Sequence, residues 1–129
     1  MAIEIRLMHG LPIIDIDVVF SGRRLCVKNV LLDTGSAGTI LNADIVSEIG
    51  VKPEETDKTA VIHGVGGTEI VFTKWFDSVT LGDSFVSPCK IEIGAMDYGI
   101  DIQGILGFDF IRLAKLVIDT VNMKIYSVN

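Results

Sequence analysis

The chain has 129 residues, with 17 acidic side chains against 11 basic ones and a formal net charge of −6. This length suits one domain over residues 1–129 and is short for two. The acidic balance disfavours nucleic acid and anionic membranes as partners, because both select basic surfaces. No apolar run is long enough to predict a transmembrane helix.

The cysteines and histidines are isolated from one another in the sequence. We expect Cys26 and Cys89 to be reduced, buried thiols, and His9 and His63 to have structural or surface roles. Without a Cys-x-x-Cys pair or a His–Cys zinc spacing, the sequence predicts neither a metal nor a cofactor. Residues 1–6 lack the basic region and hydrophobic core of a secretory signal, so we expect a cytoplasmic protein.

The N-terminal third reads as short strands. Residues 3–7 alternate as one strand, and residues 11–20 and 25–32 are predicted to form a hairpin around a turn at residues 21–24. The second arm of this hairpin ends in the apolar run Val30-Leu31-Leu32, which leads directly into Asp33. Short apolar runs that end at turn residues are typical of buried strands.

Asp33 is followed by Thr34, Gly35 and Ser36. A carboxylate at the end of an apolar strand is unfavourable unless it has partners, and the two hydroxyls can hydrogen-bond a carboxylate or the backbone. Gly35 allows a sharp turn or a close approach of another chain. The alternative interpretation is an ordinary Asx turn, because Asp and Gly are common turn residues.

A short helix is predicted over residues 43–49, with Asn42 as its N-cap and Gly50 ending it in a left-handed conformation. A glycine-rich centre, His63-Gly64-Val65-Gly66-Gly67, then lies between two β-forming runs. This pattern predicts a hairpin with an open tip. No Lys-Ser/Thr pair and no helix follow these glycines, so it is not a phosphate-binding loop. Taken alone, the segment would be an ordinary β-hairpin.

The middle of the chain continues with strands predicted over residues 71–81 and 85–93, where Pro88 indicates an edge or a bulge. Residues 94–101 are irregular and acidic. Mostly short strands separated by turns, with little helix, predict a compact all-β barrel or sandwich.

A second informative segment is Ile105-Leu106-Gly107, an apolar strand end that leads into a helix predicted over residues 108–114. Residues 116–119 and 123–128 are then predicted to form a closing hairpin. Asp109 is interpreted as a first-turn helix residue, favoured by the helix dipole. Asp119-Thr120 repeats the start of the earlier motif, but Val121 replaces its glycine, so this pair belongs to the hairpin.

The order of these segments resembles that of the retropepsin family, the single-domain aspartic proteases of retroviral type and their cellular and bacterial relatives. At residues 31–36 and 104–107 the resemblance extends to the sequence motifs of the family. It implies an all-β fold, a closed barrel with a ψ-shaped arrangement of strands and one or two short helices. It further implies a catalytic Asp33, support from Thr34, Gly35 and Ser36, a substrate-covering flap at His63, Gly64, Val65, Gly66 and Gly67, and ψ-loop strand residues Ile105, Leu106 and Gly107.

Peptide hydrolysis by carboxylates needs one ionised acid and one protonated acid. The chain carries one Asp-Thr-Gly motif, so we expect a homodimer in which Asp33 of each copy meets near a two-fold axis. Ser36 is expected to hydrogen-bond the carboxylate. By resemblance, Thr34 would contact the partner loop. The predicted function is that of an aspartic endopeptidase acting on a peptide or protein substrate.

Three alternatives remain open from the sequence. One is a binding module that keeps the fold and holds peptides or a partner without cutting them. Another is a regulatory or processing domain of a longer protein. The third is a glycoside hydrolase that uses Asp33 with Asp109 or Asp101, which requires a defined carboxylate spacing. In retroviral relatives the terminal strands interleave at the dimer contact, and residues 3–7 and 124–128 are the candidates here.

Overall fold

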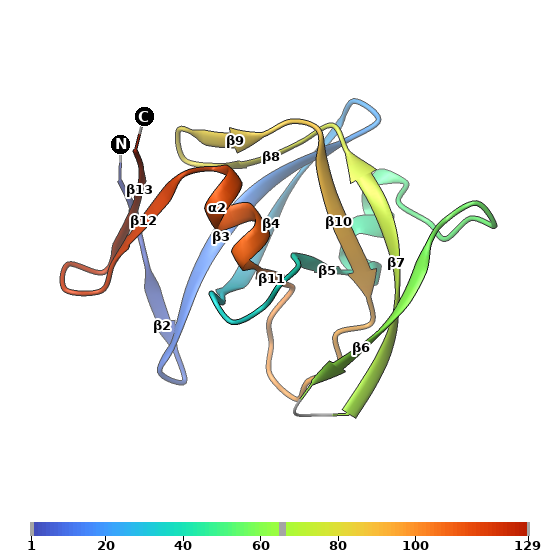
Figure 1. Cartoon of the computed structure of the whole chain (residues 1–129), viewed down its shortest axis with the longest axis horizontal. Helices are drawn as coiled ribbons and strands as arrows, with labels where there is room; N and C mark the ends of the chain where they lie inside the picture. Colours follow the sequence, from blue (N-terminus) through green and yellow to red (C-terminus); the bar gives the residue numbers. More distant parts are fainter. Residues whose placement is uncertain (1, 65–66, 129) are drawn as a thin grey trace.

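The computed structural model describes residues 2–64 and 67–128. The described residues are mostly β-strand, with two short α-helices and one 3-10 turn, which confirms the all-β class (Figure 1). No helix in the described ranges is long and apolar enough to cross a membrane.

The strands fall into two sheets. The strands of the larger sheet are β2 (Arg6–Met8), β3 (Leu11–Phe20), β4 (Arg23–Leu32), β5 (Ile40–Asn42), β6 (Thr59–Gly64), β7 (Gly67–Phe76), β8 (Ser78–Leu81), β9 (Ser84–Val86), β10 (Cys89–Gly94) and β11 (Gly104–Leu106). The smaller sheet contains β1 (Ile3–Glu4), β12 (Leu116–Asp119) and β13 (Lys124–Ser127).

The larger sheet has the strand order β6-β7-β10-β5-β11-β4-β3-β8-β9, with β2 paired to β3. Its two ends, β6 and β9, are not paired with each other among the described residues, so closure into a barrel is not confirmed. The centre of the sheet matches the expected ψ arrangement. Strand β11 lies between β4, to which it is parallel, and β5, to which it is antiparallel.

The N-terminal segment differs from the expectation of a single strand. Ile5 is buried and donates its backbone N–H to the carbonyl of Met123. This contact directs β1 onto β13, while β2 pairs with β3. The prediction of one strand over residues 3–7 was therefore wrong, because a buried residue separates two short strands that belong to different sheets.

The β3–β4 hairpin turns on only two residues. Ser21 has φ 48° and Gly22 has φ 79°. Positive φ at both central positions is the geometry of a tight type I′ turn, whose twist matches that of the flanking strands. Strand β4 consequently begins at Arg23, earlier than the sequence predicted.

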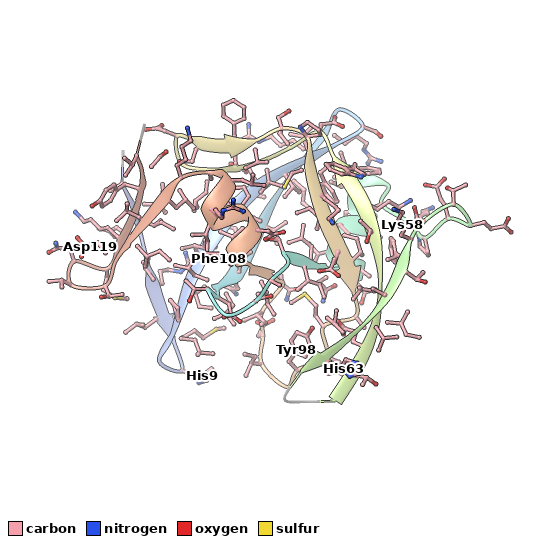
Figure 2. The ribbon with its side chains drawn as sticks, in the orientation of Figure 1. His9, Lys58, His63, Tyr98, Phe108 and Asp119 are labelled. Atoms are coloured by element: carbon pink, nitrogen blue, oxygen red, sulfur yellow. The ribbon has the colours of Figure 1, made fainter. Side chains whose placement is uncertain are left out.

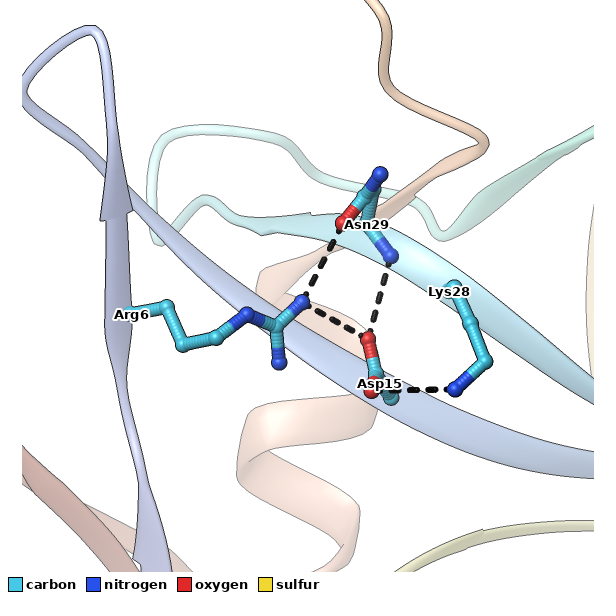
Figure 3. Close-up of polar contacts among 4 residues, drawn as sticks. All are labelled: Arg6, Asp15, Lys28 and Asn29. Carbon is cyan, nitrogen blue, oxygen red and sulfur yellow. Dashed lines mark hydrogen bonds and ion pairs between the residues drawn. The ribbon is translucent and has the colours of Figure 1, made fainter.

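The pairing of β3 with β4 shifts register between Ile14 and Ile16, and Asp15 lies at this irregularity (Figure 3). One carboxylate oxygen of Asp15 accepts hydrogen bonds from the Arg6 guanidinium at 2.8 Å and the Asn29 backbone N–H at 3.1 Å. The Lys28 ammonium lies 4.0 Å from the other oxygen. Burial alone would raise the pKa of Asp15, but these donors and positive charges lower it below its ordinary value. The carbonyl of Asn29 accepts from Gln103, which precedes β11.

The two predicted helices are present. Helix α1 (Ala43–Val46) continues as the 3-10 turn η1 (Ser47–Ile49), and Gly50 ends it with φ 89°, as expected. The side-chain oxygen of Asn42 accepts from the backbone N–H groups of Asp44 and Ile45, which confirms the N-cap. Helix α2 (Phe108–Leu113) follows β11 directly.

The strand predicted over residues 85–93 is split. Strands β9 and β10 are separated by Ser87 and Pro88, which are joined by a cis peptide bond. Residues 71–81 are likewise divided between β7 and β8, with Asp77 at the break. The carboxylate of Asp77 accepts from the backbone N–H groups of the Ser21-Gly22 turn.

The interior contains a main core and a smaller group that we call the second apolar cluster. The buried members of this cluster are Ile13, Ile40, Val71, Met96 and Ile102, and its partly buried members include Leu31, Ile62, Ile100 and Ile105. Cys89 is buried, as predicted, whereas Cys26 is exposed, so its prediction was wrong. It lies on an outward-facing position of β4. Figure 2 shows His9 at the β2–β3 turn and His63 near the end of the β6–β7 hairpin, and both are exposed.

Candidate active site

Asp33 lies at the carboxyl end of β4 and is tied to β11. Its backbone N–H donates to the carbonyl of Leu106 at 3.0 Å, so the parallel pairing of β4 and β11 extends to the start of the loop. The carbonyl of Asp33 accepts from the Ser36 N–H at 3.2 Å. Two backbone bonds therefore fix the point at which the strand becomes a loop.

The Asp33 side chain is half-buried, and one of its two carboxylate oxygens accepts a hydrogen bond. Its Oδ1 accepts a 2.9 Å hydrogen bond from the Gly35 backbone N–H. This is the bond of an Asx turn, so the turn that the sequence offered as an alternative is present here. The Oδ2 oxygen receives no hydrogen bond from any described residue and is open to a further partner.

Ser36 does not contact the carboxylate as the sequence suggested. Its hydroxyl donates to the carbonyl of Gly38 at 2.8 Å, within the same loop. The hydroxyl instead satisfies the Gly38 carbonyl, which accepts no backbone hydrogen bond from the described residues and which the tight loop would leave unpaired. Thr34 is exposed and lies at the surface beside Asp33.

The ψ-loop residues pack closely beneath this loop. Ile105 and Leu106 pair in register with Leu31 and Leu32 of β4. Gly107 lies so close to the loop that a Cβ on it would overlap the carbonyl of Gly38. A side chain at this position is therefore excluded by the backbone of the active-site loop.

Thr39 and Asp109 join the end of the loop to helix α2. The Thr39 hydroxyl donates to Asp109 Oδ1 at 2.8 Å, and the Thr39 backbone N–H donates to Oδ2 at 3.3 Å. The same hydroxyl accepts from the Gly107 N–H at 3.0 Å. Asp109 Oδ1 also accepts from the Phe110 N–H, which agrees with the first-turn helix role predicted for it. Thr39 was not singled out from the sequence, since a threonine after two small residues carries no distinctive signal.

The sheet surface next to Asp33 is apolar. Side chains two residues apart on a strand share a face, so Leu31 lies on the side of Asp33. Leu31 and Ile105 belong to the second apolar cluster, together with Ile62 of β6 and Val71 of β7. The β6–β7 hairpin therefore packs its inner side against the apolar surface next to Asp33.

The predicted flap corresponds to the end of this hairpin. His63 pairs with Thr68, and Gly64 pairs with Gly67. Val65 and Gly66 lie outside the described residues. A carboxylate holds β7 to the irregular segment of residues 95–103: Glu69 accepts from the Met96 N–H at 2.9 Å and from the Tyr98 hydroxyl at 3.0 Å. Burial and this carboxylate raise the pKa of Tyr98 to about 12.

Two cavities flank the active-site loop. One, of about 260 Å³, is lined by Asp33 and Thr34 with Ile118, Thr120 and Met123 of the C-terminal hairpin. The other, of about 720 Å³, begins at residues 37–39 and extends along β7 and β10. No group of His, Cys, Asp or Glu side chains in the described part of the chain is arranged to hold a metal ion.

Ionisable groups of the larger cavity are perturbed by their surroundings. Burial and the negative charge of Asp109 raise the pKa of Glu92, although the nearby Lys90 opposes the change. Burial raises the pKa of the Cys89 thiol to about 11, with a further contribution from Asp109. Asp109 therefore raises the pKa of two groups that line the larger cavity, in addition to accepting hydrogen bonds from Thr39.

The chain was compared with curated proteins, solved structures and protein families. No curated protein matches the chain. Among solved structures, a retropepsin-like aspartic protease from Rickettsia conorii superimposes with a TM-score of 0.68 at 19% identity, covering 98% of both chains. The family model described as aspartyl protease matches residues 16–110, from β3 into the first turn of α2. This match spans well over half of the chain, and the protein, which has a retropepsin-like fold, accordingly belongs to the aspartyl protease family.

Proposed function

We propose that the protein is an aspartic endopeptidase that is active as a homodimer and uses the Asp33 carboxylate of each copy. The observation that carries this proposal is the Asp33 side chain itself. The ψ-loop fixes it at the end of a central strand, one oxygen is held by Gly35, and the other has no donor among the described residues. The chain supplies one such loop, so a second copy must supply the second acid.

In the proposed reaction, two Asp33 carboxyl groups share one proton, because like charges a few ångströms apart cannot both ionise comfortably. The ionised group takes a proton from a water molecule, whose oxygen forms a bond to the peptide carbonyl carbon. The protonated group donates its proton to the carbonyl oxygen. The C–N bond then breaks as the amine accepts the proton that the first Asp33 took from water, and a hydroxyl of the intermediate returns its proton to the second Asp33, which yields a carboxyl group, an amine and the starting pair of carboxyl groups.

The geometry supports an extended peptide as substrate. The apolar surface of Leu31, Ile105, Ile62 and Val71 adjoins Asp33. Apolar side chains next to the scissile bond would be removed from water there, which favours binding. The β6–β7 hairpin of each copy would act as the flap over the bound peptide.

A mixing experiment tests the shared site. Wild-type protein and the Asp33→Asn variant are mixed in varied proportions at a constant total concentration, subunits are allowed to exchange, and the cleavage rate of a peptide library is measured. If each site needs two Asp33 carboxylates, activity falls with the square of the wild-type fraction. A fall in simple proportion to that fraction would mean that one chain forms a complete site.

Sedimentation of the same samples gives the oligomeric state. A folded dimer that cleaves no peptide across the acid to neutral range would instead support the binding module considered above. A monomer that cleaves peptides would contradict the homodimer.

A further inference from the structure

The larger cavity forms a groove that the proposed catalysis does not use. It lies between the active-site loop and helix α2 on one side and strands β7 and β10 on the other. We call it the distal groove and define it by Gly38, Thr39, Trp75, Lys90, Glu92 and Leu113. Its volume of about 720 Å³ is in the range of sites that hold small ligands or several peptide side chains.

The distal groove continues the sheet face that adjoins Asp33. On β7, Val71 belongs to the second apolar cluster, and Thr73 and Trp75 follow it at two-residue spacing. Such residues lie on the same face of a strand. The active-site loop makes the same connection, since it begins at Asp33 and reaches the groove at Gly38. An extended chain advances about 3.3 Å per residue, so a peptide lying on this face passes from one region to the other within a few residues.

Glu92 gives the groove its chemical preference. Its side chain is half-buried and receives no hydrogen bond or ion pair from any described residue. It lies so close to the loop that a Cβ on Gly38 would overlap its Oε1. A carboxylate partly removed from water without a donor is unfavourable, and a bound donor relieves that state.

Trp75 supplies an aromatic surface beside this carboxylate. Glu92 pairs with Thr73 and Lys90 pairs with Trp75, so Trp75 and Glu92 are diagonal neighbours on one face of the sheet. The Trp75 side chain is 62% exposed. An indole face and a carboxylate together favour a lysine or arginine side chain, through cation–π attraction and a charge-assisted hydrogen bond.

Two lysines of the chain, Lys58 and Lys90, also line the groove. Lys58 precedes β6 (Figure 2), and Lys58 and Lys90 are both exposed. Neither lies within ion-pair distance of Glu92 among the described residues, although the charge of Lys90 acts on Glu92 from farther away and partly opposes the rise in its pKa. Long charged side chains of this kind extend toward water. The net charge of −6 also attracts basic peptides over longer distances.

Building on the proteolytic function proposed above, we infer that the distal groove binds a segment of the same peptide substrate remote from the scissile bond. We infer further that Glu92 and Trp75 select a lysine or arginine in that segment.

Trp75 makes the test direct, because it is the single tryptophan of the chain. The Asp33→Asn variant of the full chain is titrated with short uncharged apolar peptides in which one lysine is moved along the sequence. We expect a saturable change in tryptophan emission that is strongest for lysine at one remote position. Replacing that lysine by glutamate should weaken binding about tenfold, as should Glu92→Gln in the protein. The matched control is Glu48→Gln, an exposed glutamate of η1 outside the groove, which should leave the affinity unchanged.

The outcomes separate the groove from the catalytic proposal. Lysine-dependent emission changes support the groove even if the wild-type protein cleaves nothing. Peptides that are cleaved by the wild type, and bind the Asp33→Asn variant by calorimetry without changing the emission, would overturn the groove and leave the protease intact. Equal affinity for lysine and glutamate peptides, or an unchanged affinity in Glu92→Gln, would overturn the selection of a basic side chain.

Discussion

The hydroxyl of Thr39 and the carboxylate of Asp109, 70 residues apart in the chain, are joined by a 2.8 Å hydrogen bond. The same hydroxyl accepts the backbone N–H of Gly107. One threonine thus connects the end of the active-site loop, the end of β11 and the first turn of α2. Because Asp33 begins this loop, its position depends on a contact at the opposite end.

Replacing Asp109 with Ala should therefore impair both stability and hydrolysis. The change leaves the Thr39 hydroxyl and N–H without their acceptor in a partly buried site, which costs about 1–3 kcal/mol in the free energy of unfolding. Urea denaturation and kcat/KM for a cleaved peptide measure the two effects. Asp109→Asn, which keeps one oxygen acceptor, should lose less. An Asp109→Ala variant as stable and active as the exposed-site control Glu55→Ala would show that the contact is dispensable.

Gly107→Ala should be more harmful than a glycine substitution at an open position. The new Cβ would overlap the Gly38 carbonyl and approach the Ser36 carbonyl to 2.9 Å, so backbone must shift. We expect a loss of about 2–3 kcal/mol in stability together with the loss of hydrolysis. Gly99→Ala has open space around it but a φ of +78°, so it should cost only about 1 kcal/mol. Thermal or urea unfolding compares the pair, and equal stabilities would contradict the packing argument.

The Asp15 cluster predicts a pH dependence of stability. The pKa of Asp15 is lower in the folded protein than its ordinary value of 3.8. The ionised form is thus favoured by folding: its contribution is present above about pH 4 and is lost as the pH falls through the folded pKa. At neutral pH, Asp15→Asn should be about 1 kcal/mol less stable than the wild type, a modest value because the side chain is partly exposed.

The difference between wild type and Asp15→Asn should shrink as the pH is lowered below 4, as followed by urea unfolding. Arg6→Gln removes the main partner of Asp15 and should show the same convergence at low pH. A difference that is constant across this range would assign the loss to packing instead of charge.

The two thiols should react at different rates. Cys26 is exposed, whereas Cys89 is buried and burial raises its pKa to about 11. Because the thiolate is the reactive form, alkylation of Cys89 near pH 8 should be at least about 100-fold slower in the folded protein. Mass spectrometry of peptides at timed intervals gives both rates. Similar rates in the folded protein, or no acceleration of Cys89 in urea, would contradict the burial.

The strand ends of the central architecture could be predicted because their signals are local: Leu31–Leu32 followed by Asp33, and Ile105–Leu106 followed by Gly107, each mark one. That these two strand ends lie side by side was implied by the family resemblance, and the pairing of β4 with β11 confirms it. The Asn42 cap and the left-handed Gly50 were also predictable, since each depends on neighbours within one turn of helix.

The features that the sequence did not reveal depend on contacts across the fold. The division of residues 3–7 into two strands results from the bond between Ile5 and Met123. The Ser36 hydroxyl binds the Gly38 carbonyl because the loop brings that carbonyl within reach and leaves it without a backbone donor among the described residues. The proximity of Glu92 and Trp75 could not be predicted, because it depends on the pairing of β7 with β10, which places them diagonally on one face. Local propensity carries no information about such long-range partners.

The central claim is that two Asp33 carboxylates form one site, and the most direct measurement is the distance between them in a crystal structure of the assembled protein. We predict a two-fold dimer whose nearest Asp33 oxygens are about 2.6–3.2 Å apart, within hydrogen-bonding reach. A monomer, or a dimer in which the two carboxylates are separated by other side chains, would contradict the account.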